Sequence, residues 1–410
     1  MTHAPVPSGL FEPVRLGRLD LPNRLVMAPL TRNRAGADGV PGTLMSTYYA
    51  QRATAGLIIA EAAAPNPVGQ TYPNIPAIHN AAQVAGWQRV TEAVRDAGGR
   101  MFLQLQHGGR VGHPHTSGLI PIAPSPIPLP DTIHTPSGRR PSVAPREMTA
   151  HDIRTTVADF AAAARNALAA GFEGVEVHAA NGHLLHQFMA SNSNRRTDLY
   201  GGPVENRVRF AVEVVRAVAQ AIGPERVGVR ISPGGIFNGV REDDTETLYP
   251  ALVHALAGIG WELGGPARTG GRPGDAGTGL AYLHIVFADP DQPLFSQIRA
   301  AWPGRLIANP KLGWGGPLPA DGGRASGERL LAAGADIIAL GRAFLANPDL
   351  VERLRSGAPL NPPRDEYFMY TGGATGYIDY PTLKAAAQHG QALEAFRRPY
   401  TSGHTGQQAG

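Results

Sequence analysis

Eight short apolar segments alternate with helical segments along the chain, and this alternation restricts the fold more than any other feature. Each apolar segment has the length of a buried strand, and strands that alternate with helices are typical of a parallel sheet. The predicted strands are residues 24–28, 57–60, 101–105, 174–177, 227–231, 281–286, 305–308 and 336–340. Eight such units predict an α/β fold in which the sheet closes into a (β/α)8 TIM barrel.

The helical segments have the one-sided apolar pattern that helices around a barrel need. In residues 151–170 the apolar stripe consists of Ile153, Val157, Phe160, Ala161, Ala164 and Leu168. Thr149 and Asp152 predict a capping box at the start of this helix. The other predicted helices include residues 83–97 and 243–257. An open doubly wound sheet would instead carry a glycine-rich turn after its first strand, where this chain has Pro29-Leu30-Thr31.

Composition excludes several classes of protein. The 410 residues include no cysteine, no apolar stretch of the ~18 residues that span a membrane, and no basic N-terminal segment followed by an apolar run. We therefore expect a cytoplasmic protein with no membrane partner. The net charge of +4 is small and the basic residues are dispersed, which argues against a function in nucleic-acid binding. We expect an N-terminal arm (residues 1–9), one domain (10–398) and a flexible tail (399–410).

Polar residues follow the predicted strands at the edge where a TIM barrel carries its active site. In chain order they are Thr31, Glu61, Gln104, His178, Arg230, His284, Asn309, Gly341 and Arg342. Any one of them alone is equally well a helix cap or a loop residue, but their convergence predicts a single site. Gly341-Arg342 precedes a short helical piece after the last strand. Such a helix is the usual phosphate site of this fold, so we expect a phosphorylated ligand.

Residues 175–210 join a strand ending in His178 to a charged loop and an amphipathic helix. They read VEVHAANGHLLHQFMASNSNRRTDLYGGPVENRVRF. The block resembles the old yellow enzyme family of flavin-dependent ene-reductases, which carry His-x-x-Asn or His-x-x-His, then G-Y-L-L-x-Q-F and N-x-R-T-D-x-Y-G-G-x-x-E-N-R. The family's tyrosine is His183 here. Residues 341–350 and 376–381 also match family patterns, and the resemblance covers residues 10–398.

The resemblance implies noncovalent FMN. The predicted flavin contacts are the backbone of Pro29 and Leu30, with Thr31, Ala62, Gln104 and Arg230, and the predicted phosphate contacts are Lys311, Gly341 and Arg342. Gln104 suits the pyrimidine edge, and Arg230 suits the negative charge of reduced flavin, with a barrel-core salt bridge as its alternative role. Thr31 stands where another branch has cysteine, which favours the classical branch. Lys311 is expected to contact the phosphate because Pro310 beside it has no backbone N–H to donate.

The resemblance also implies an oxidoreductase that takes hydride from NADPH or NADH and reduces an electron-poor alkene or nitro compound. His178 and Asn181 would hydrogen-bond the substrate oxygen and stabilise negative charge as hydride leaves flavin N5. His183 would donate a proton to the substrate, leave that step to water, or shape the cavity. Gln106, where tryptophan is frequent, and Tyr377 would line the substrate pocket, although Tyr377 is equally well a packing residue.

Two segments are unusually long. Residues 109–146, after the third strand, are rich in proline, and the family carries a hairpin lid there. Residues 261–279 contain seven glycines and are predicted as a flexible insertion on the opposite face. We expect a small-molecule substrate, and a protein that is a monomer or a homodimer.

A metal-dependent hydrolase, a glycosidase and a non-catalytic flavin-binding barrel are the alternatives to this function. A metal-dependent barrel hydrolase would draw on His178, His183, His186 and the His113/His115 pair. No His-x-His ends the first strand and no carboxylate ends the seventh or eighth, so we predict no metal. A glycosidase lacks its second carboxylate for the same reason. The replaced tyrosine leaves a non-catalytic flavin-binding barrel as the other alternative.

Overall fold

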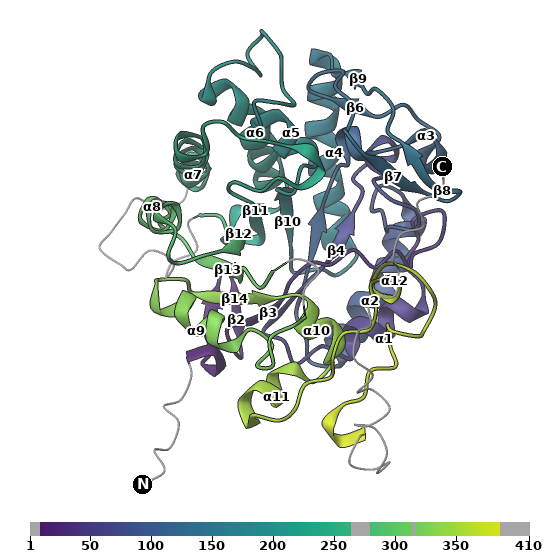
Figure 1. Cartoon of the computed structure of the whole chain (residues 1–410), viewed down its shortest axis with the longest axis vertical. Helices are drawn as coiled ribbons and strands as arrows, with labels where there is room; N and C mark the ends of the chain where they lie inside the picture. Colours follow the sequence, from purple (N-terminus) through teal and green to yellow (C-terminus); the bar gives the residue numbers. More distant parts are fainter. Residues whose placement is uncertain (1–8, 264–278, 314–316, 386–410) are drawn as a thin grey trace, which may run out of the picture.

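Eight parallel strands form a closed barrel at the centre of the molecule, in the order β10-β11-β12-β13-β14-β3-β4-β5 (Figure 1). This computed structural model describes residues 9–263, 279–313 and 317–385, so most of the predicted arm and of the glycine-rich insertion, and the whole predicted tail, lie outside it. The barrel strands are β3 (Leu25–Met27), β4 (Leu57–Ala63), β5 (Met101–Leu105), β10 (Gly174–Ala179), β11 (Val227–Ile231), β12 (Tyr282–Ala288), β13 (Leu306–Pro310) and β14 (Ile337–Leu340). Each overlaps a predicted strand, and the TIM-barrel prediction is confirmed.

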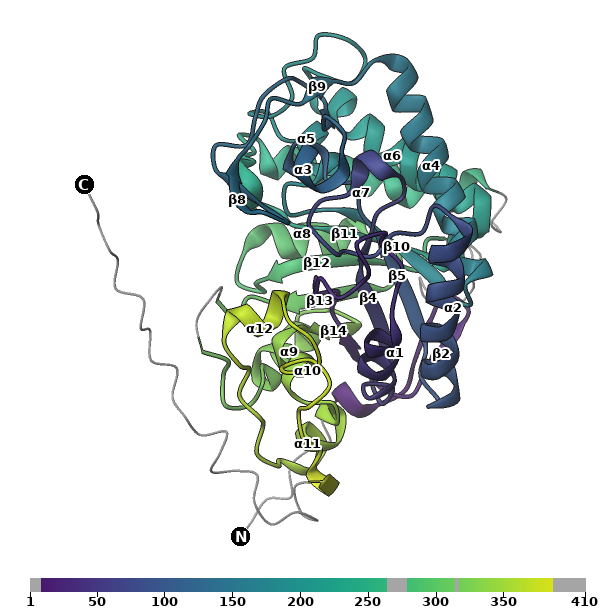
Figure 2. The same cartoon turned by 90° about the vertical axis from the view of Figure 1, so that its right-hand side faces the viewer.

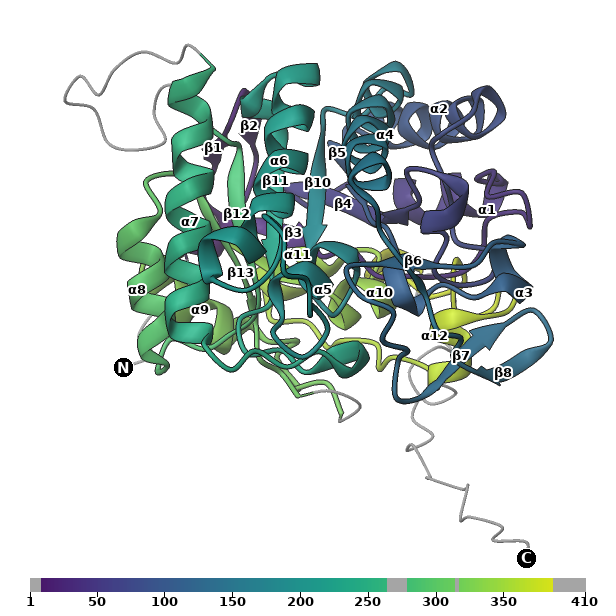
Figure 3. The same ribbon diagram turned by 90° about the horizontal axis from the view of Figure 1, so that it is seen from above.

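Helices surround the barrel, and α2, α4, α6 and α7 stand beside one another around it (Figure 3). The longer helices are α1 (Thr43–Ala50), α2 (Ala81–Asp96), α4 (Ala150–Ala169), α6 (Val204–Ile222), α7 (Thr245–Glu262), α8 (Pro293–Ala301) and α9 (Arg324–Ala332). The short ones are α3 (Pro114–Ser117), α5 (Leu184–Met189), α10 (Arg342–Ala346), α11 (Leu350–Ser356) and α12 (Glu366–Tyr370). Helix α4 begins with the predicted capping box of Thr149 and Asp152. No helix within the described ranges is long and apolar enough to cross a membrane.

The interior of the barrel changes from apolar to polar along the strands. Successive residues of a strand point to opposite sides, so every second residue enters the barrel. Near the amino ends these inward residues, among them Phe102 and Tyr282, form an apolar cluster separate from the core under the helices. Two residues further along, Gln104 follows Phe102 and His284 follows Tyr282. The polar residues therefore gather at the carboxyl ends.

A two-stranded hairpin that we did not predict closes the other end of the barrel. Strands β1 (Val14–Leu16) and β2 (Leu19–Leu21) pair antiparallel, and Val14, Leu16, Leu19 and Leu21 belong to the same apolar cluster as Phe102 and Tyr282. Figure 3 shows this hairpin on the side from which β10 starts. The amino end of the barrel is thus sealed by apolar side chains, and the carboxyl end is left for a ligand.

The insertion after β5 forms the predicted hairpin at the carboxyl end of the barrel. Strands β7 (Thr132–Thr135) and β8 (Gly138–Pro141) pair antiparallel, while β6 (Ile122–Ala123) and β9 (Arg146–Glu147) pair parallel at the root of the insertion. Figure 2 shows the insertion and α12 on the same side of the barrel.

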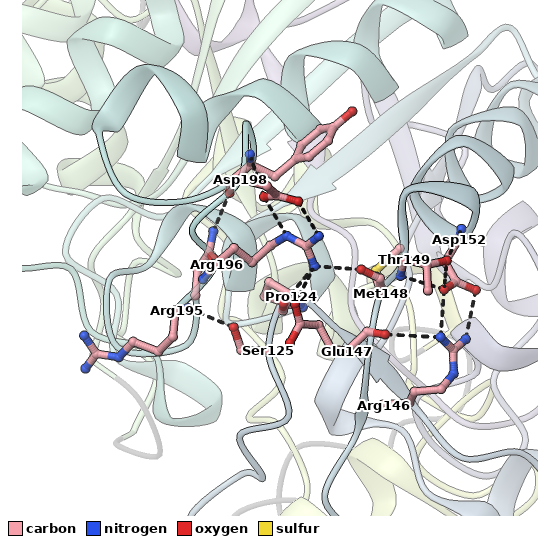
Figure 4. Close-up of polar contacts among 12 residues, drawn as sticks. Pro124, Ser125, Arg146, Glu147, Met148, Thr149, Asp152, Arg195, Arg196 and Asp198 are labelled. Carbon is pink, nitrogen blue, oxygen red and sulfur yellow. Dashed lines mark hydrogen bonds and ion pairs between the residues drawn. The ribbon is translucent and has the colours of Figure 1, made fainter.

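Arg196 ties both ends of this insertion to the loop after α5 (Figure 4). Its Nη1 donates hydrogen bonds to the carbonyl oxygens of Pro124, at 3.1 Å, and Met148, at 2.7 Å. Its Nε and Nη2 donate to the Asp198 carboxylate at 3.0 and 2.6 Å. Arg196-Thr197-Asp198, part of the stretch that resembles the family, therefore fixes the root of the lid.

Candidate active site

Four polar side chains from four adjacent strands meet inside the barrel near its carboxyl end. Gln104 lies on β5, His178 on β10, Arg230 on β11 and His284 on β12, and all four are buried. His178 is in register with Arg230, and Arg230 with His284. The structure thus brings together residues from the middle of the predicted set.

Glu176, one inward position below His178, holds two of these side chains. Gln104 Nε2 donates to Glu176 Oε1 at 2.8 Å, and His284 Nδ1 lies 2.8 Å from Glu176 Oε2. Burial opposes ionisation of Glu176, but the interactions with His284, Arg230 and Gln104 hold its pKa below the ordinary value. Burial also lowers the pKa of His284. The pair is therefore an ionised carboxylate that accepts a hydrogen bond from a neutral imidazole.

Arg230 is fixed at the top of the barrel by oxygen atoms of two other strand ends. Its Nη2 donates to Asn309 Oδ1 at 3.0 Å, and its Nη1 donates to the Pro29 carbonyl at 3.4 Å. Its Nε is buried without a hydrogen-bond partner. Burial lowers the pKa of Arg230, but guanidinium stays cationic at neutral pH because its ordinary pKa exceeds ~12. Arg230 is therefore a buried cation whose Nε–H is available to donate a hydrogen bond to a ligand.

His178, Asn181 and His183 also lie together. The rings of His178 and His183 are 5.0 Å apart, centre to centre, and both side chains are buried. Asn181 has a left-handed backbone with φ 55°. Its Oδ1 and both ring nitrogens of His183 are buried without hydrogen-bond partners. Unsatisfied buried polar atoms are costly, and their grouping here indicates a ligand site.

Neighbouring loops clamp the backbone of Asn181. Its N–H donates to Ser232 Oγ at 2.9 Å, and Asn238 Nδ2 donates to its carbonyl oxygen at 2.8 Å. Gly182 follows with φ 72°, and a side chain there would collide with the Phe237 carbonyl. Only glycine permits this close approach. The loop after β11 therefore determines how Asn181 faces the site.

A buried His186–Glu242 pair holds the loop that contains Asn181 and Gly182. The N–H of Gly182 donates to His186 Nδ1 at 3.0 Å, and His186 Nε2 lies 2.6 Å from Glu242 Oε1. Because Nδ1 accepts a hydrogen bond, Nε2 carries the proton and donates a hydrogen bond to the carboxylate. His186, which the hydrolase alternative grouped with His178 and His183, is thus a structural residue.

Burial makes both active-site histidines weak bases. The pKa of His178 falls well below its ordinary value, mainly through burial and then through the nearby His183 and Arg230. Burial lowers the pKa of His183 to about 4, and the polar backbone of Ala180 opposes the shift only in part. Both rings are therefore neutral at pH 7. Any titration of His183 is expected near pH 4 and not near ~6.5.

The predicted flavin residues after β3 and β4 lie beside a second buried carboxylate. The register of β4 against β5 shifts between Ala60 and Ala63, so Glu61 and Ala62 occupy a bulge of the kind that redirects side chains near active sites. Glu61 Oε2 accepts the Arg32 N–H at 3.0 Å, next to Thr31. Burial raises the pKa of Glu61 to about 7.

Gln106 and Tyr377, the other predicted substrate residues, are both buried. Gln106 Nε2 donates to Thr71 Oγ1 at 2.9 Å. The Tyr377 ring stacks on Tyr48 at 4.1 Å and lies 4.4 Å from the Arg34 guanidinium. The ring contacts are those of a packing residue, whereas the Tyr377 hydroxyl is buried without a hydrogen-bond partner, so the packing role and the substrate role both stay predictions.

The predicted phosphate residues lie at the ends of β13 and β14. Gly341 and Arg342 begin α10, and Arg342 Nη2 donates to the Gly313 carbonyl in the loop after β13, at 3.1 Å. Arg342 thus reaches between the two loops expected to bind phosphate. Lys311 is exposed and borders a hollow of about 180 Å³ that Asp289 and Asp291 also line. Arg329 lines the same hollow and pairs with Asp291, so the hollow has no excess of positive charge that would support an anion contact by Lys311. The role of Lys311 stays a prediction.

A larger hollow of about 420 Å³ lies between the lid hairpin and the loop after β11. Tyr72, Ile133, Arg139 and Asn238 are among its lining residues. Asn238 also bonds the backbone of Asn181, so this hollow adjoins the predicted substrate anchors. The lid therefore borders a hollow that lies next to the backbone contact of Asn181.

Several functional neighbours were missing from the predicted set. The inward alternation along β10, two residues before His178, contained the signal for Glu176. His186 and Glu242 gave no separate signal, because their pairing requires the loops after β10 and β11 to meet. The same holds for Ser232 and Asn238.

Comparison with known proteins agrees with this geometry. The model of the NADH:flavin oxidoreductase / NADH oxidase family matches residues 9–361. A probable flavin mononucleotide-dependent alkene reductase of Leishmania infantum is 40% identical over 386 residues, covering 91% of this chain and 97% of the relative. The old yellow enzyme homologue of Zymomonas mobilis superposes with a TM-score of 0.81 at 37% identity, covering 91% of this chain and 99% of that structure. Morphinone reductase in complex with tetrahydroNAD superposes with a TM-score of 0.80 at 42% identity, covering 92% of this chain and 98% of that structure.

These similarities extend over the whole barrel and include the elements that carry His178, Asn181, Arg230 and Arg342. They decide against the metal-dependent hydrolase, which shares only the barrel. The chain belongs to the NADH:flavin oxidoreductase / NADH oxidase family, as a member of the old yellow enzymes.

Proposed function

We propose that the protein is an FMN-dependent ene-reductase that reduces the activated C=C bond of α,β-unsaturated carbonyl or nitro compounds with hydride from NADPH or NADH. The observation that carries this function is the grouping of His178, Asn181 and His183 beside the buried cation of Arg230, with buried polar atoms of Asn181 and His183 that have no hydrogen-bond partner. The name of the Leishmania relative specifies an alkene reductase, and the tetrahydroNAD complex of morphinone reductase supports a nicotinamide donor.

The residues at the carboxyl end fit FMN. The spare Nε of Arg230 is a donor for the pyrimidine edge of the ring, and Gln104 and the backbone of Pro29 lie at the same end of the barrel. Leu30, Thr31 and Ala62 would complete the ring contacts, and Gly341 and Arg342 would hold the phosphate. Bound there, FMN supplies the hydride chemistry that no side chain of the protein offers.

His178 and Asn181 would bind the oxygen of the substrate carbonyl or nitro group. Donors that are already in place stabilise developing negative charge without reorganisation, and one such donor is worth on the order of 100-fold or more in rate. Loop contacts fix the Asn181 backbone, and the strand fixes His178. The pair would therefore orient the substrate and polarise its double bond.

The proton that completes the reduction has two candidate sources. At pH 7 His183 is a neutral ring, which is a much weaker acid than imidazolium. Its lowered pKa therefore favours water as the proton source, with His183 shaping the cavity. Donation by His183 remains the alternative.

The visible spectrum of the purified protein tests this function. We expect one noncovalent FMN per chain, bleached by NADPH or NADH without oxygen and restored by an enone such as cyclohexenone. A colourless protein that does not take up FMN would refute the flavin site. Bound FMN that no nicotinamide reduces would instead support the non-catalytic flavin-binding barrel. A cytoplasmic location, the preferred nicotinamide and a monomeric or homodimeric state stay predictions.

A further inference from the structure

A continuous line of hydrogen bonds leads from the middle of the barrel to the substrate anchor. It begins at Glu176, passes through the Gln104 amide and ends at the ring of His178. Gln104 Nε2 lies 2.8 Å from Glu176 Oε1 and 3.4 Å from His178 Nδ1. All three side chains are buried, so water does not compete for these contacts.

The carboxylate determines which way the Gln104 amide points. An ionised carboxylate can only accept hydrogen bonds, so Gln104 must turn its NH₂ group and not its carbonyl oxygen toward Glu176. His284 donates to the second carboxylate oxygen and keeps the group in place. Reversing the amide would set two oxygen atoms against each other in a buried site.

The amide in turn determines where His178 carries its proton. One hydrogen of Gln104 Nε2 goes to Glu176 and the other points to His178 Nδ1. Since Nε2 of Gln104 has no lone pair to offer, His178 Nδ1 must be the acceptor of that contact. A neutral imidazole has one N–H, so the proton of His178 lies on its Nε2.

We infer that Glu176 is a positioning residue for the reaction: through Gln104 it holds His178 as the Nε2–H tautomer, which is the form that donates a hydrogen bond to the substrate oxygen. This inference rests on the proposed function, because it gives His178 the task of a donor. Glu176 contacts Gln104 and His284 and would touch neither substrate nor the reacting atoms. A histidine with its proton on Nδ1 would instead turn an acceptor toward the substrate.

The test is to read the tautomer directly. Holoenzyme labelled with ¹⁵N-histidine would be studied by long-range ¹H–¹⁵N NMR, with the His178 signals assigned by their loss in His178→Ala. We expect wild-type His178 to show the Nε2–H pattern. Nδ1–H in the wild type would overturn the inference without the need for any further variant, and it would leave the proposed function standing.

Glu176→Gln removes the acceptor-only group at nearly constant size. Both orientations of Gln104 then become possible, so we expect His178 to populate the Nδ1–H tautomer. The oxidative half-reaction with cyclohexenone should slow in proportion to the lost Nε2–H fraction, which a merely structural role would not produce. An unchanged His178 spectrum in this variant would reject the inference.

His284→Asn is the matched control. It changes the other partner of Glu176, but the asparagine amide still provides a donor to the same carboxylate oxygen. We expect the His178 tautomer to be unchanged, and a switch of tautomer in this variant would contradict the assignment to Glu176 and Gln104. A wild-type protein that shows the Nε2–H pattern but reduces no enone would reject the proposed function alone.

Discussion

Replacing Glu242 with alanine should destabilise the protein strongly, although Glu242 is not among the predicted catalytic residues. Its carboxylate accepts hydrogen bonds from His186 Nε2 at 2.6 Å, from the Gly234 N–H at 3.0 Å and from Thr245 Oγ1 at 3.0 Å. The Tyr249 hydroxyl donates a fourth. The side chains of Glu242 and His186 are both fully buried.

The loss of stability in Glu242→Ala depends on the donors that stay buried and cannot form a hydrogen bond to water. A hydrogen bond to a charged group contributes about 1.5–3 kcal/mol. The N–H of Gly234 and the hydroxyl of the half-buried Thr245 can bond water after the substitution, whereas the ring of His186 and the hydroxyl of Tyr249 are buried. Two orphaned buried donors give a loss of about 3–6 kcal/mol, which overlaps the roughly 3–5 kcal/mol typical of breaking a buried pair.

Urea unfolding of the holoenzyme, followed by tryptophan fluorescence and by flavin release, measures this loss. Glu262→Ala is the matched control, because Glu262 forms a surface ion pair with Arg216 at 2.9 Å that should contribute less than about 1 kcal/mol. A Glu242→Ala variant that unfolds within about 1 kcal/mol of the wild type would refute the reasoning.

The effect of Glu242 should also depend on pH in one direction. Burial opposes its ionisation, but hydrogen bonds from His186, Tyr249 and Gly234 hold its pKa below the ordinary value. A carboxyl group with a lowered folded-state pKa stabilises the protein above its unfolded pKa of ~4.3, and this contribution is lost as pH falls through the folded value. The free energies of unfolding of the wild type and of Glu242→Ala should therefore show their full difference at pH 7, and this difference should shrink as the pH falls into the acid range.

Three further predictions concern the site itself. His178→Ala combined with Asn181→Ala should slow reoxidation of the reduced enzyme by cyclohexenone at least 100-fold while reduction by NADPH changes less, since each donor is worth on the order of 100-fold; equal rates in stopped-flow reoxidation would exclude the anchoring role. Arg230→Ala should weaken FMN binding about 10- to 100-fold, because a charged hydrogen bond of about 1.5–3 kcal/mol is lost; equilibrium dialysis measures this, and unaltered retention would contradict it. With the His183 pKa at about 4, the oxidative rate should show no His183 titration between pH 5 and 9, and His183→Phe should keep that profile if water supplies the proton. A rate that falls as pH rises through 6 to 7, in the wild type only, would restore His183 as the donor.

The barrel was predictable because its strands are buried on both faces and therefore appear as short apolar runs. The predicted ends of the strands agree closely with the observed ends. Residues 101–105 and 227–231, for example, were predicted with the observed bounds. The β1–β2 hairpin was missed although its signal was present: Val-Arg-Leu and Leu-Asp-Leu alternate around Gly17, which has the positive φ that a tight turn requires. The hairpin lies outside the alternation of strands and helices, which is the pattern that predicts the barrel.

The site was predictable only where the fold itself fixes the side chain. Gln104, His178 and Arg230 lie on strands, so the closure of the barrel brings them together. The clamp on Asn181 by Asn238 depends on the path of a loop, which no periodicity encodes. The acidity of His183 depends on how deeply the ring is buried, and a sequence specifies this only through the complete fold.

The Arg196 clamp has a consequence for protein engineering and for divergence of the family. Arg196 bonds main-chain oxygens at both ends of the lid and the Glu147 carboxylate at 3.3 Å, so the clamp depends little on the other side chains between Pro124 and Met148. The hairpin between them is therefore an exchangeable cassette on a fixed frame. A lid taken from a relative, joined at these two residues, should dock without redesign of the barrel, and substrate range can change while the chemistry beneath it is preserved.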